Sequence, residues 1–137
     1  MAPQRTTAKV AVERLTRILL VEDEPLTAEV FAQALVRDGH QVVVARDGVQ
    51  ALRRLRNQVP TVVVLDMNLP TMSGAEVVRR LRADGHTKLP VIVVSGASPN
   101  STLLDRSQLE PGTWLEKPVK PRDLARIVRQ FVRGADE

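Results

Sequence analysis

Four short hydrophobic segments of this 137-residue chain are followed by side chains that could do chemistry. These side chains are three carboxylates, one hydroxyl and one ammonium group: Glu22, Asp23, Asp66, Ser95 and Lys117. A carboxylate can attack phosphorus in line, while cations and a hydroxyl donor balance the oxygens of the transferred group. If the fold brings these groups together, the set suits phosphoryl transfer with Asp66 as the acceptor.

The three acids need a counter-charge if they meet. Two unit charges about 4 Å apart interact by roughly 4 kcal/mol at an effective dielectric near 20. An all-oxygen cluster without histidine or cysteine suits Mg²⁺, so a magnesium site is expected at Glu22, Asp23 and Asp66. Each residue also has an ordinary explanation, because acids favour helix N-termini and an aspartate can cap a loop. The functional hypothesis therefore depends on the whole set.

The segment at residues 61–66 is the element that must position Asp66. Its run of valines and a leucine indicates a strand buried on both faces. Pro70 follows closely and cannot donate to a central ladder. Asp66 is therefore predicted at the carboxyl end of a central parallel strand, where open α/β sheets place their chemistry.

Strands and helices are predicted to alternate along the rest of the chain. Strands are expected at residues 17–21, 41–45, 61–66, 90–95 and 113–116. Helices are expected at 25–37 and 49–57, after Ser73, as a short or late-starting piece within 97–112, and from Pro121. This order predicts an α/β fold, a doubly wound, five-stranded parallel sheet of order 2-1-3-4-5 and flavodoxin-like layout. Strands one, three, four and five are then neighbours, so the five side chains converge.

Hydrophobic periodicity also assigns faces and ends to the helices. The core side of the first helix is expected to contain Leu26, Val30, Phe31 and Leu35. Solvent-exposed arginines are expected at Arg79, Arg82, Arg122, Arg126, Arg129 and Arg133. Asp47 and Ser73 are predicted helix N-caps.

Composition narrows the class of protein. There is no cysteine, which excludes disulfides, thiolate zinc sites and a cysteine nucleophile. The net charge is +4 and the pI about 10.3, but aromatic content is only 2%, so a stacking surface for nucleic acid is not expected. No apolar run approaches the roughly 20 residues of a membrane span, and no signal peptide is recognisable. We expect a cytoplasmic protein with neither membrane nor direct nucleic-acid contacts.

Four motifs, in chain order, resemble those of the receiver domain of bacterial two-component response regulators: ILLVEDEP, VVVLDMNLP, VIVVSGA and WLEKPV. The resemblance covers residues 17–133, which leaves residues 1–16 as an N-terminal tail and 134–137 as a C-terminal tail. It implies that Asp66 is the phosphoacceptor, supplied by phosphohistidine on a histidine kinase or phosphotransfer protein. The receiver would catalyse this transfer onto itself.

The resemblance also implies roles for the neighbouring residues. Asp23 matches a direct Mg²⁺ ligand, Glu22 an acid that reaches the metal through water, and Asn68 a residue whose backbone carbonyl completes the site. Ser95 matches the hydroxyl that turns to the phosphoryl group, and Lys117 the lysine that pairs with it, often before a cis proline. Trp114 occupies a switch position that is usually Tyr, Phe or His. It either moves with Ser95 or is fixed in the core.

The expected function is a phosphorylation-dependent switch. Its output would be protein contact through the fourth helix, fifth strand and last helix, with an unidentified partner, as a monomer or a phosphorylation-dependent dimer. One alternative is a receiver excised from a larger hybrid kinase or regulator. Another is an aspartyl-nucleophile phosphatase, which is disfavoured because Asn68 stands where a general acid is needed. A flavin-binding module is disfavoured by the lack of aromatics and of a glycine-rich phosphate loop.

Overall fold

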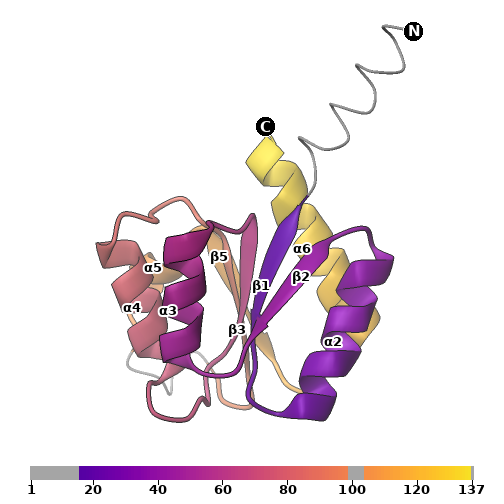
Figure 1. Cartoon of the computed structure of the whole chain (residues 1–137), viewed down its shortest axis with the longest axis horizontal. Helices are drawn as coiled ribbons and strands as arrows, with labels where there is room; N and C mark the ends of the chain where they lie inside the picture. Colours follow the sequence, from indigo (N-terminus) through magenta and orange to yellow (C-terminus); the bar gives the residue numbers. More distant parts are fainter. Residues whose placement is uncertain (1–15, 99–103, 137) are drawn as a thin grey trace, which may run out of the picture.

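The computed structural model describes residues 16–98 and 104–136, so nearly all of the predicted N-terminal tail lies outside the described residues. Five strands alternate with helices (Figure 1). The strands are β1 (Arg17–Val21), β2 (Gln41–Ala45), β3 (Val62–Asp66), β4 (Val91–Ser95) and β5 (Gly112–Glu116). The helices are α2 (Pro25–Arg37), α3 (Gly48–Asn57), α4 (Gly74–Ala83), α5 (Arg106–Leu109) and α6 (Pro121–Asp136). Every predicted strand is confirmed to within one residue at each end.

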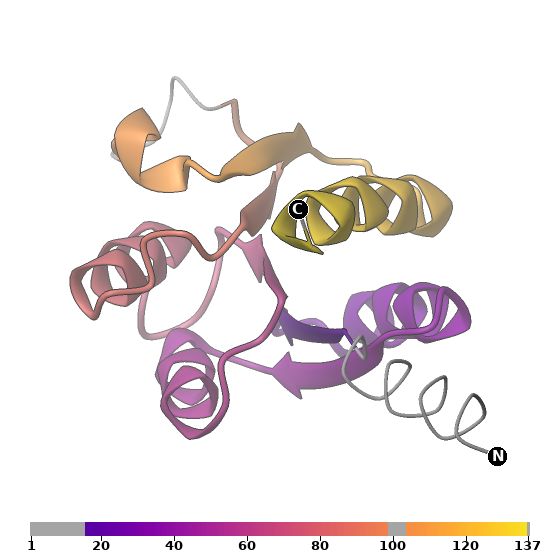
Figure 2. The same cartoon turned by 90° about the horizontal axis from the view of Figure 1, so that it is seen from above.

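All strand pairs are parallel, and their order is β2-β1-β3-β4-β5, as predicted. Helices α2 and α6 cover one face of the sheet, and α3 and α4 cover the other (Figures 1 and 2). Asp66 pairs in register with Val94, and Ser95 with Glu116. The carboxyl ends of β3, β4 and β5 therefore lie at the same edge of the sheet.

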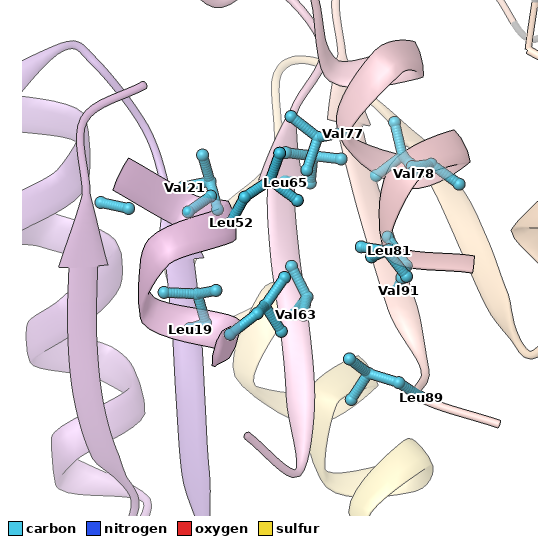
Figure 3. Packing of buried hydrophobic residues seen from close by; sticks show 14 of the residues in the cluster. Leu19, Val21, Leu52, Val63, Leu65, Val77, Val78, Leu81, Leu89 and Val91 are labelled. Atoms are coloured by element: carbon cyan, nitrogen blue, oxygen red, sulfur yellow. The ribbon is translucent and has the colours of Figure 1, made fainter. Parts of the chain in front are cut away.

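The core consists of two layers, one on each face of the sheet. Alternate strand residues such as Leu19, Val63 and Val91 pack against α3 and α4 (Figure 3). Their neighbours, such as Ile18 and Val64, pack against α2 and α6. Strands β3 and β4 are buried along their whole length. This two-sided burial explains why their sequences are continuous apolar runs rather than alternating patterns.

The predicted N-caps are confirmed. The Asp47 carboxylate accepts from the Gln50 backbone N–H at 2.8 Å, and the Ser73 hydroxyl accepts from the Glu76 N–H at 3.2 Å. An additional cap, which we did not predict, is Glu24, whose carboxylate accepts from the Thr27 N–H at 2.7 Å. These hydrogen bonds lower the pKa of Glu24. Side chains thus satisfy free N–H groups at the start of three helices.

The assignment of Leu26 and Val30 to the core is wrong. Leu26 is 70% exposed and Val30 47% exposed, whereas Ala28, Phe31 and Leu35 form the buried stripe of α2. At 3.6 residues per turn, positions 26 and 30 lie about half a turn away from positions 28, 31 and 35. The sequence pattern did not reveal the stripe of Ala28, Phe31 and Leu35, because alanine is only weakly hydrophobic.

The prediction that Arg82 is solvent-exposed is also wrong. Its guanidinium group is partly buried and donates hydrogen bonds to backbone carbonyls on both sides of the α4–α5 contact. The acceptors are the carbonyl oxygens of His86 at 2.7 Å, Leu89 at 2.6 Å, Gln108 at 2.7 Å, Leu109 at 3.4 Å and Pro111 at 3.1 Å. Burial lowers the pKa of Arg82. Arg82 therefore fastens α5 and the start of β5 to the end of α4.

Helix α5 is short and starts late, as predicted. The Asp105 carboxylate caps it by accepting from the Ser107 N–H at 2.9 Å. A Cβ atom added at Gly112 would lie only 2.1 Å from the Val91 carbonyl oxygen, so β5 starts in close backbone contact with β4. Because α5 has a single turn, its carbonyls have few partners within the helix, and Arg82 donates to two of them, those of Gln108 and Leu109.

His40 predicts a pH dependence of stability. Its ring Nδ1 is a hydrogen-bond partner of the Thr16 hydroxyl, while Nε2 is buried without a partner among the described residues. Burial lowers the pKa of His40 from 6.5, and the charge of Arg129 adds to this while that of Asp38 opposes it. As the pH falls through 6.5, His40 takes up a proton in the unfolded chain more readily than in the folded protein. Protonation therefore favours unfolding, and the free energy of unfolding decreases as the pH falls.

We expect the urea midpoint of the wild type to fall more steeply than that of H40Q between about pH 7.5 and 5.5. Comparing the two proteins removes the contribution of every other titrating group. Equal slopes for wild type and H40Q would show that folding does not perturb His40.

Candidate functional site

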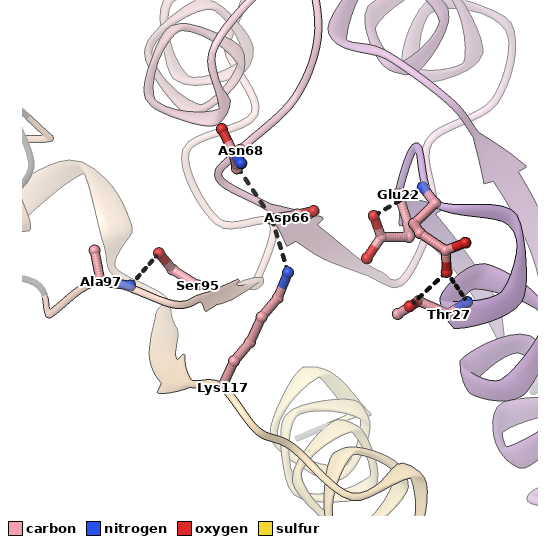
Figure 4. A network of polar contacts seen from close by, with 8 residues as sticks. Glu22, Thr27, Asp66, Asn68, Ser95, Ala97 and Lys117 are labelled. Carbon is pink, nitrogen blue, oxygen red and sulfur yellow. Dashed lines mark hydrogen bonds and ion pairs between the residues drawn. The ribbon is translucent and has the colours of Figure 1, made fainter.

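Asp66 lies at the carboxyl end of β3 with its side chain almost fully buried (Figure 4). One carboxylate oxygen, Oδ1, accepts from the Asn68 backbone N–H at 3.0 Å. The same oxygen lies 3.4 Å from the Lys117 ammonium nitrogen, which comes from the chain after β5. Asp66 is thus a buried carboxylate with a backbone donor and a cation on one of its oxygens.

An acidic cluster occupies the side of Asp66 toward β1. Carboxylate oxygens of Glu22, Asp23 and Asp66 all lie within 4.8 Å of one another. The pKa of Glu22 is raised to about 7, first by burial and then by its hydrogen bond with Asp66 and the negative charge of Asp66, while the Glu24 N–H and the charge of Lys117 oppose the rise. The raised pKa shows that a negative charge on Glu22 is unfavourable here, because the group is buried and lies beside Asp66. Three oxygen donors of this kind fit Mg²⁺.

The Ser95 hydroxyl faces its own loop in this structure. It accepts from the Ala97 backbone N–H at 3.1 Å (Figure 4). The Ala97 carbonyl accepts from the Trp114 indole N–H at 3.0 Å. Ser95 and Trp114 therefore bond to the same residue, Ser95 to the Ala97 N–H and Trp114 to the Ala97 carbonyl.

Gly74 brings the start of α4 against the end of β3. Its N–H donates to the Met67 carbonyl at 3.1 Å. A Cβ atom at this position would lie 2.7 Å from Met67 Cα and 3.0 Å from the Asp66 carbonyl oxygen. Only glycine allows this approach, which fixes the backbone immediately after Asp66.

Thr71 in the same loop has a strained backbone. It is the one non-glycine residue in the described part of the chain with a left-handed φ, 63°. This conformation costs a β-branched residue about 1–2 kcal/mol and costs asparagine less. We expect T71N to raise the free energy of unfolding by about 1 kcal/mol, measured by urea denaturation. T87N is the matched control, and equal stability of the two variants would refute the strain at Thr71.

The structure places all six residues predicted for the site at the carboxyl edge of the sheet: Glu22, Asp23, Asp66, Asn68, Ser95 and Lys117. The Lys117–Pro118 peptide bond is cis, as expected. Trp114 lies on β5, partly buried, and its indole N–H donates to the Ala97 carbonyl. Sequence reasoning missed Ala97 because its contribution is a backbone carbonyl. It missed Glu24 as a cap, although an acid directly before Pro25 is a usable signal.

Comparison with known proteins gives consistent matches. The family model for the response regulator receiver domain matches residues 18–129. The chain is 34% identical over 122 residues to the DNA-binding response regulator MtrA of Mycolicibacterium smegmatis, covering 88% of this chain and 53% of that protein. It is 34% identical over 116 residues to the transcriptional regulatory protein CreB of Escherichia coli, covering 85% of this chain and 50% of CreB. The chain thus spans about half the length of these curated relatives.

Solved structures show the same similarity. A CheY-like response regulator receiver domain protein from Methanospirillum hungatei JF-1 superposes with a TM-score of 0.80 at 25% identity, covering 89% of this chain and 97% of that one. A sensor protein from Polaromonas sp. JS666 gives a TM-score of 0.77 at 30% identity, covering 88% and 98%. None of the helices in the described residues is long and apolar enough to cross a membrane.

Proposed function

Because the chain belongs to the family of response regulator receiver domains, we propose that it is a phosphorylation-dependent switch with Asp66 as its phosphoacceptor. The observation that carries this proposal is the environment of Asp66. Its buried carboxylate lies between Lys117 on one side and the acids Glu22 and Asp23 on the other. An incoming phosphoryl group brings negative charge, which Lys117 and a cation held by the acids would balance.

The transfer proceeds by attack of an Asp66 carboxylate oxygen on the phosphorus of a phosphohistidine. The new O–P bond makes an acyl phosphate, the N–P bond breaks, and the imidazole leaves with the electron pair. Lys117, which lies 3.4 Å from Oδ1, remains close enough to pair with the transferred oxygens. The donor is a histidine kinase or a histidine phosphotransfer protein.

Glu22, Asp23 and Asp66, with the backbone carbonyl of Asn68, are the residues that would hold Mg²⁺. When bound, the ion would supply positive charge beside the phosphoryl oxygens. Glu22 is buried on one side of this cluster. The exposed Asp23 leaves the other side open to solvent and to the donor protein.

Ser95 would respond by exchanging its Ala97 hydrogen bond for one to the phosphoryl group, which carries about −1.5 to −2 charge. This rotation frees the Ala97 N–H while the Trp114 indole still holds the Ala97 carbonyl. Trp114 lies on β5, next to α5, so the signal would leave through the face formed by α5, β5 and α6. The output partner would contact this face, which is also where a phosphorylation-dependent dimer would form.

MtrA is described as DNA-binding and CreB as a transcriptional regulator. The output of this receiver could therefore pass to an effector on the same polypeptide or on another protein. Turnover as a phosphatase has less support, because the amide of Asn68 is not acidic enough to act as a general acid.

Incubation with acetyl phosphate and Mg²⁺ tests the proposal. We expect intact-mass analysis to show one added phosphoryl group on the wild type and none on D66N. D47N, which changes a helix N-cap aspartate outside the acidic cluster, should be phosphorylated like the wild type. Equal modification of D66N and wild type would overturn the assignment.

A further inference from the structure

Helices α2 and α6 lie side by side on one face of the sheet (Figure 2). Residues of both helices and of the chain just before α6 line an open groove of about 510 Å³. None of its lining residues belongs to the acidic cluster or to the Ser95–Trp114 loop. We call it the α2–α6 groove.

The walls of the α2–α6 groove are strongly basic. Four cationic side chains line it: Arg37, Lys120, Arg122 and Arg129. The one acid in the lining, Asp38, is already neutralised, because Arg129 binds both its oxygens at 2.8 to 3.1 Å. This pairing lowers the pKa of Asp38. The other three cations have no acidic partner among the described residues, so the groove retains uncompensated positive charge.

The groove is also pre-organised. The two-oxygen pairing between Arg129 and Asp38 ties α6 to the end of α2 and holds one wall in place. Small or rigid apolar residues, Ala34, Pro121 and Ala125, line the groove between the cations. A ligand with carboxylates on a flexible backbone could lay its methylene groups on this surface while its charges reach the arginines.

We propose that the α2–α6 groove binds an acidic segment of a partner protein, one that presents several aspartate or glutamate side chains. Charge complementarity selects such a segment and speeds its association. A nucleic-acid strand fits less well, because no aromatic residue lines the groove to stack on a base. The groove uses the α2 side of α6, whereas the face proposed for output uses α6 together with α5 and β5, so binding in the groove is not expected to require phosphorylation of Asp66.

The test uses the full unphosphorylated chain and a fluorescein-labelled peptide of alternating glutamate and serine. Fluorescence anisotropy should show saturable binding, and a glutamine–serine peptide should not bind. The double variant R37Q/R122Q should weaken binding about tenfold or more. The matched control R53Q/R56Q removes two exposed arginines from α3, on the opposite face, and should change affinity by no more than about twofold. Thermal unfolding of both variants checks that each is folded.

Three results would overturn the proposal. The first is that the glutamate–serine peptide fails to bind. The second is that R37Q/R122Q and R53Q/R56Q lower the affinity for the peptide equally, which would mean that binding follows net charge alone. A single-stranded oligonucleotide could instead bind more tightly than the peptide and lose affinity only in R37Q/R122Q. That outcome would assign the groove to nucleic acid rather than to an acidic protein segment.

Discussion

The substitution R82Q is expected to lower the free energy of unfolding by about 3 kcal/mol. Arg82 donates to carbonyls from the end of α4 and from the α5–β5 connection, and it is partly buried. A hydrogen bond to a charged donor contributes roughly 1.5–3 kcal/mol, and acceptors left without partners add a desolvation cost. Some of these carbonyls can form hydrogen bonds with water in R82Q, so the loss of stability should be smaller than the sum of the individual hydrogen-bond contributions. Urea denaturation followed by circular dichroism measures the loss.

Two further variants separate the geometry of Arg82 from its charge. R82K keeps the positive charge but lacks the planar fork that reaches several carbonyls, so it should recover less than half of the loss. R80Q makes the same change two residues away, where the arginine is exposed and pairs with Glu76 at 3.0 Å. R80Q should cost no more than about 0.5 kcal/mol. If R82Q and R80Q were equally stable, Arg82 would not fasten α5.

The double substitution E22Q/D23N is expected to abolish stabilisation by Mg²⁺. A ligand that binds only the folded state adds about 2.7 kcal/mol at a hundred times its dissociation constant. The variant loses two of the three carboxylates that lie within 4.8 Å of one another, so it should show no rise in melting temperature with Mg²⁺. Without Mg²⁺ it should be at least as stable as the wild type, because it no longer gathers like charges.

Melting curves in Mg²⁺ and in EDTA, for wild type and variant, provide the measurement. E29Q/D84N is the matched control, since it removes two exposed carboxylates from α2 and the end of α4. It should keep the full response to Mg²⁺. A Mg²⁺ response of equal size in E22Q/D23N would place the ion elsewhere, and the acidic cluster would then have no role in metal binding.

The sheet and its site were predictable because the signals for them are local. Buried parallel strands such as β3 and β4 read as apolar runs, and the residue after each run must lie at the carboxyl edge. In a parallel sheet with this strand order, Asp66 and Lys117 must lie at the same edge, with one strand between them, even though they are far apart in the sequence. Helix caps such as Asp47 and Ser73 are equally local and were also predictable.

The features that could not be predicted depend on contacts between distant backbone groups. The sequence pattern around Arg82 is that of an exposed helix face, and nothing in it shows that carbonyls from α5 lie within reach. Trp114 on β5 raises the same problem, because its partner is the Ala97 carbonyl in the chain just after β4. In α2, two large apolar residues gave a stronger hydrophobic signal than Ala28, although Ala28 faces the core.

Trp114 is neither simply core nor free in the structure. It packs against the hydrophobic layer under α3 and α4 while its indole N–H remains bonded to Ala97. Ala97 donates its N–H to Ser95 and accepts from the Trp114 indole at its carbonyl, so a movement of Trp114 in response to Ser95 would have to involve Ala97.

Identifying the phosphorylated residue tests most directly whether Asp66 is the phosphoacceptor. Borohydride reduces an aspartyl phosphate to homoserine, so reduction after phosphorylation, followed by peptide mapping, marks the acceptor residue. We predict homoserine at position 66 in the wild type and at no position in D66N. Homoserine at Asp23, or an acid-stable phosphate on Ser95, would contradict the assignment of Asp66 as the phosphoacceptor.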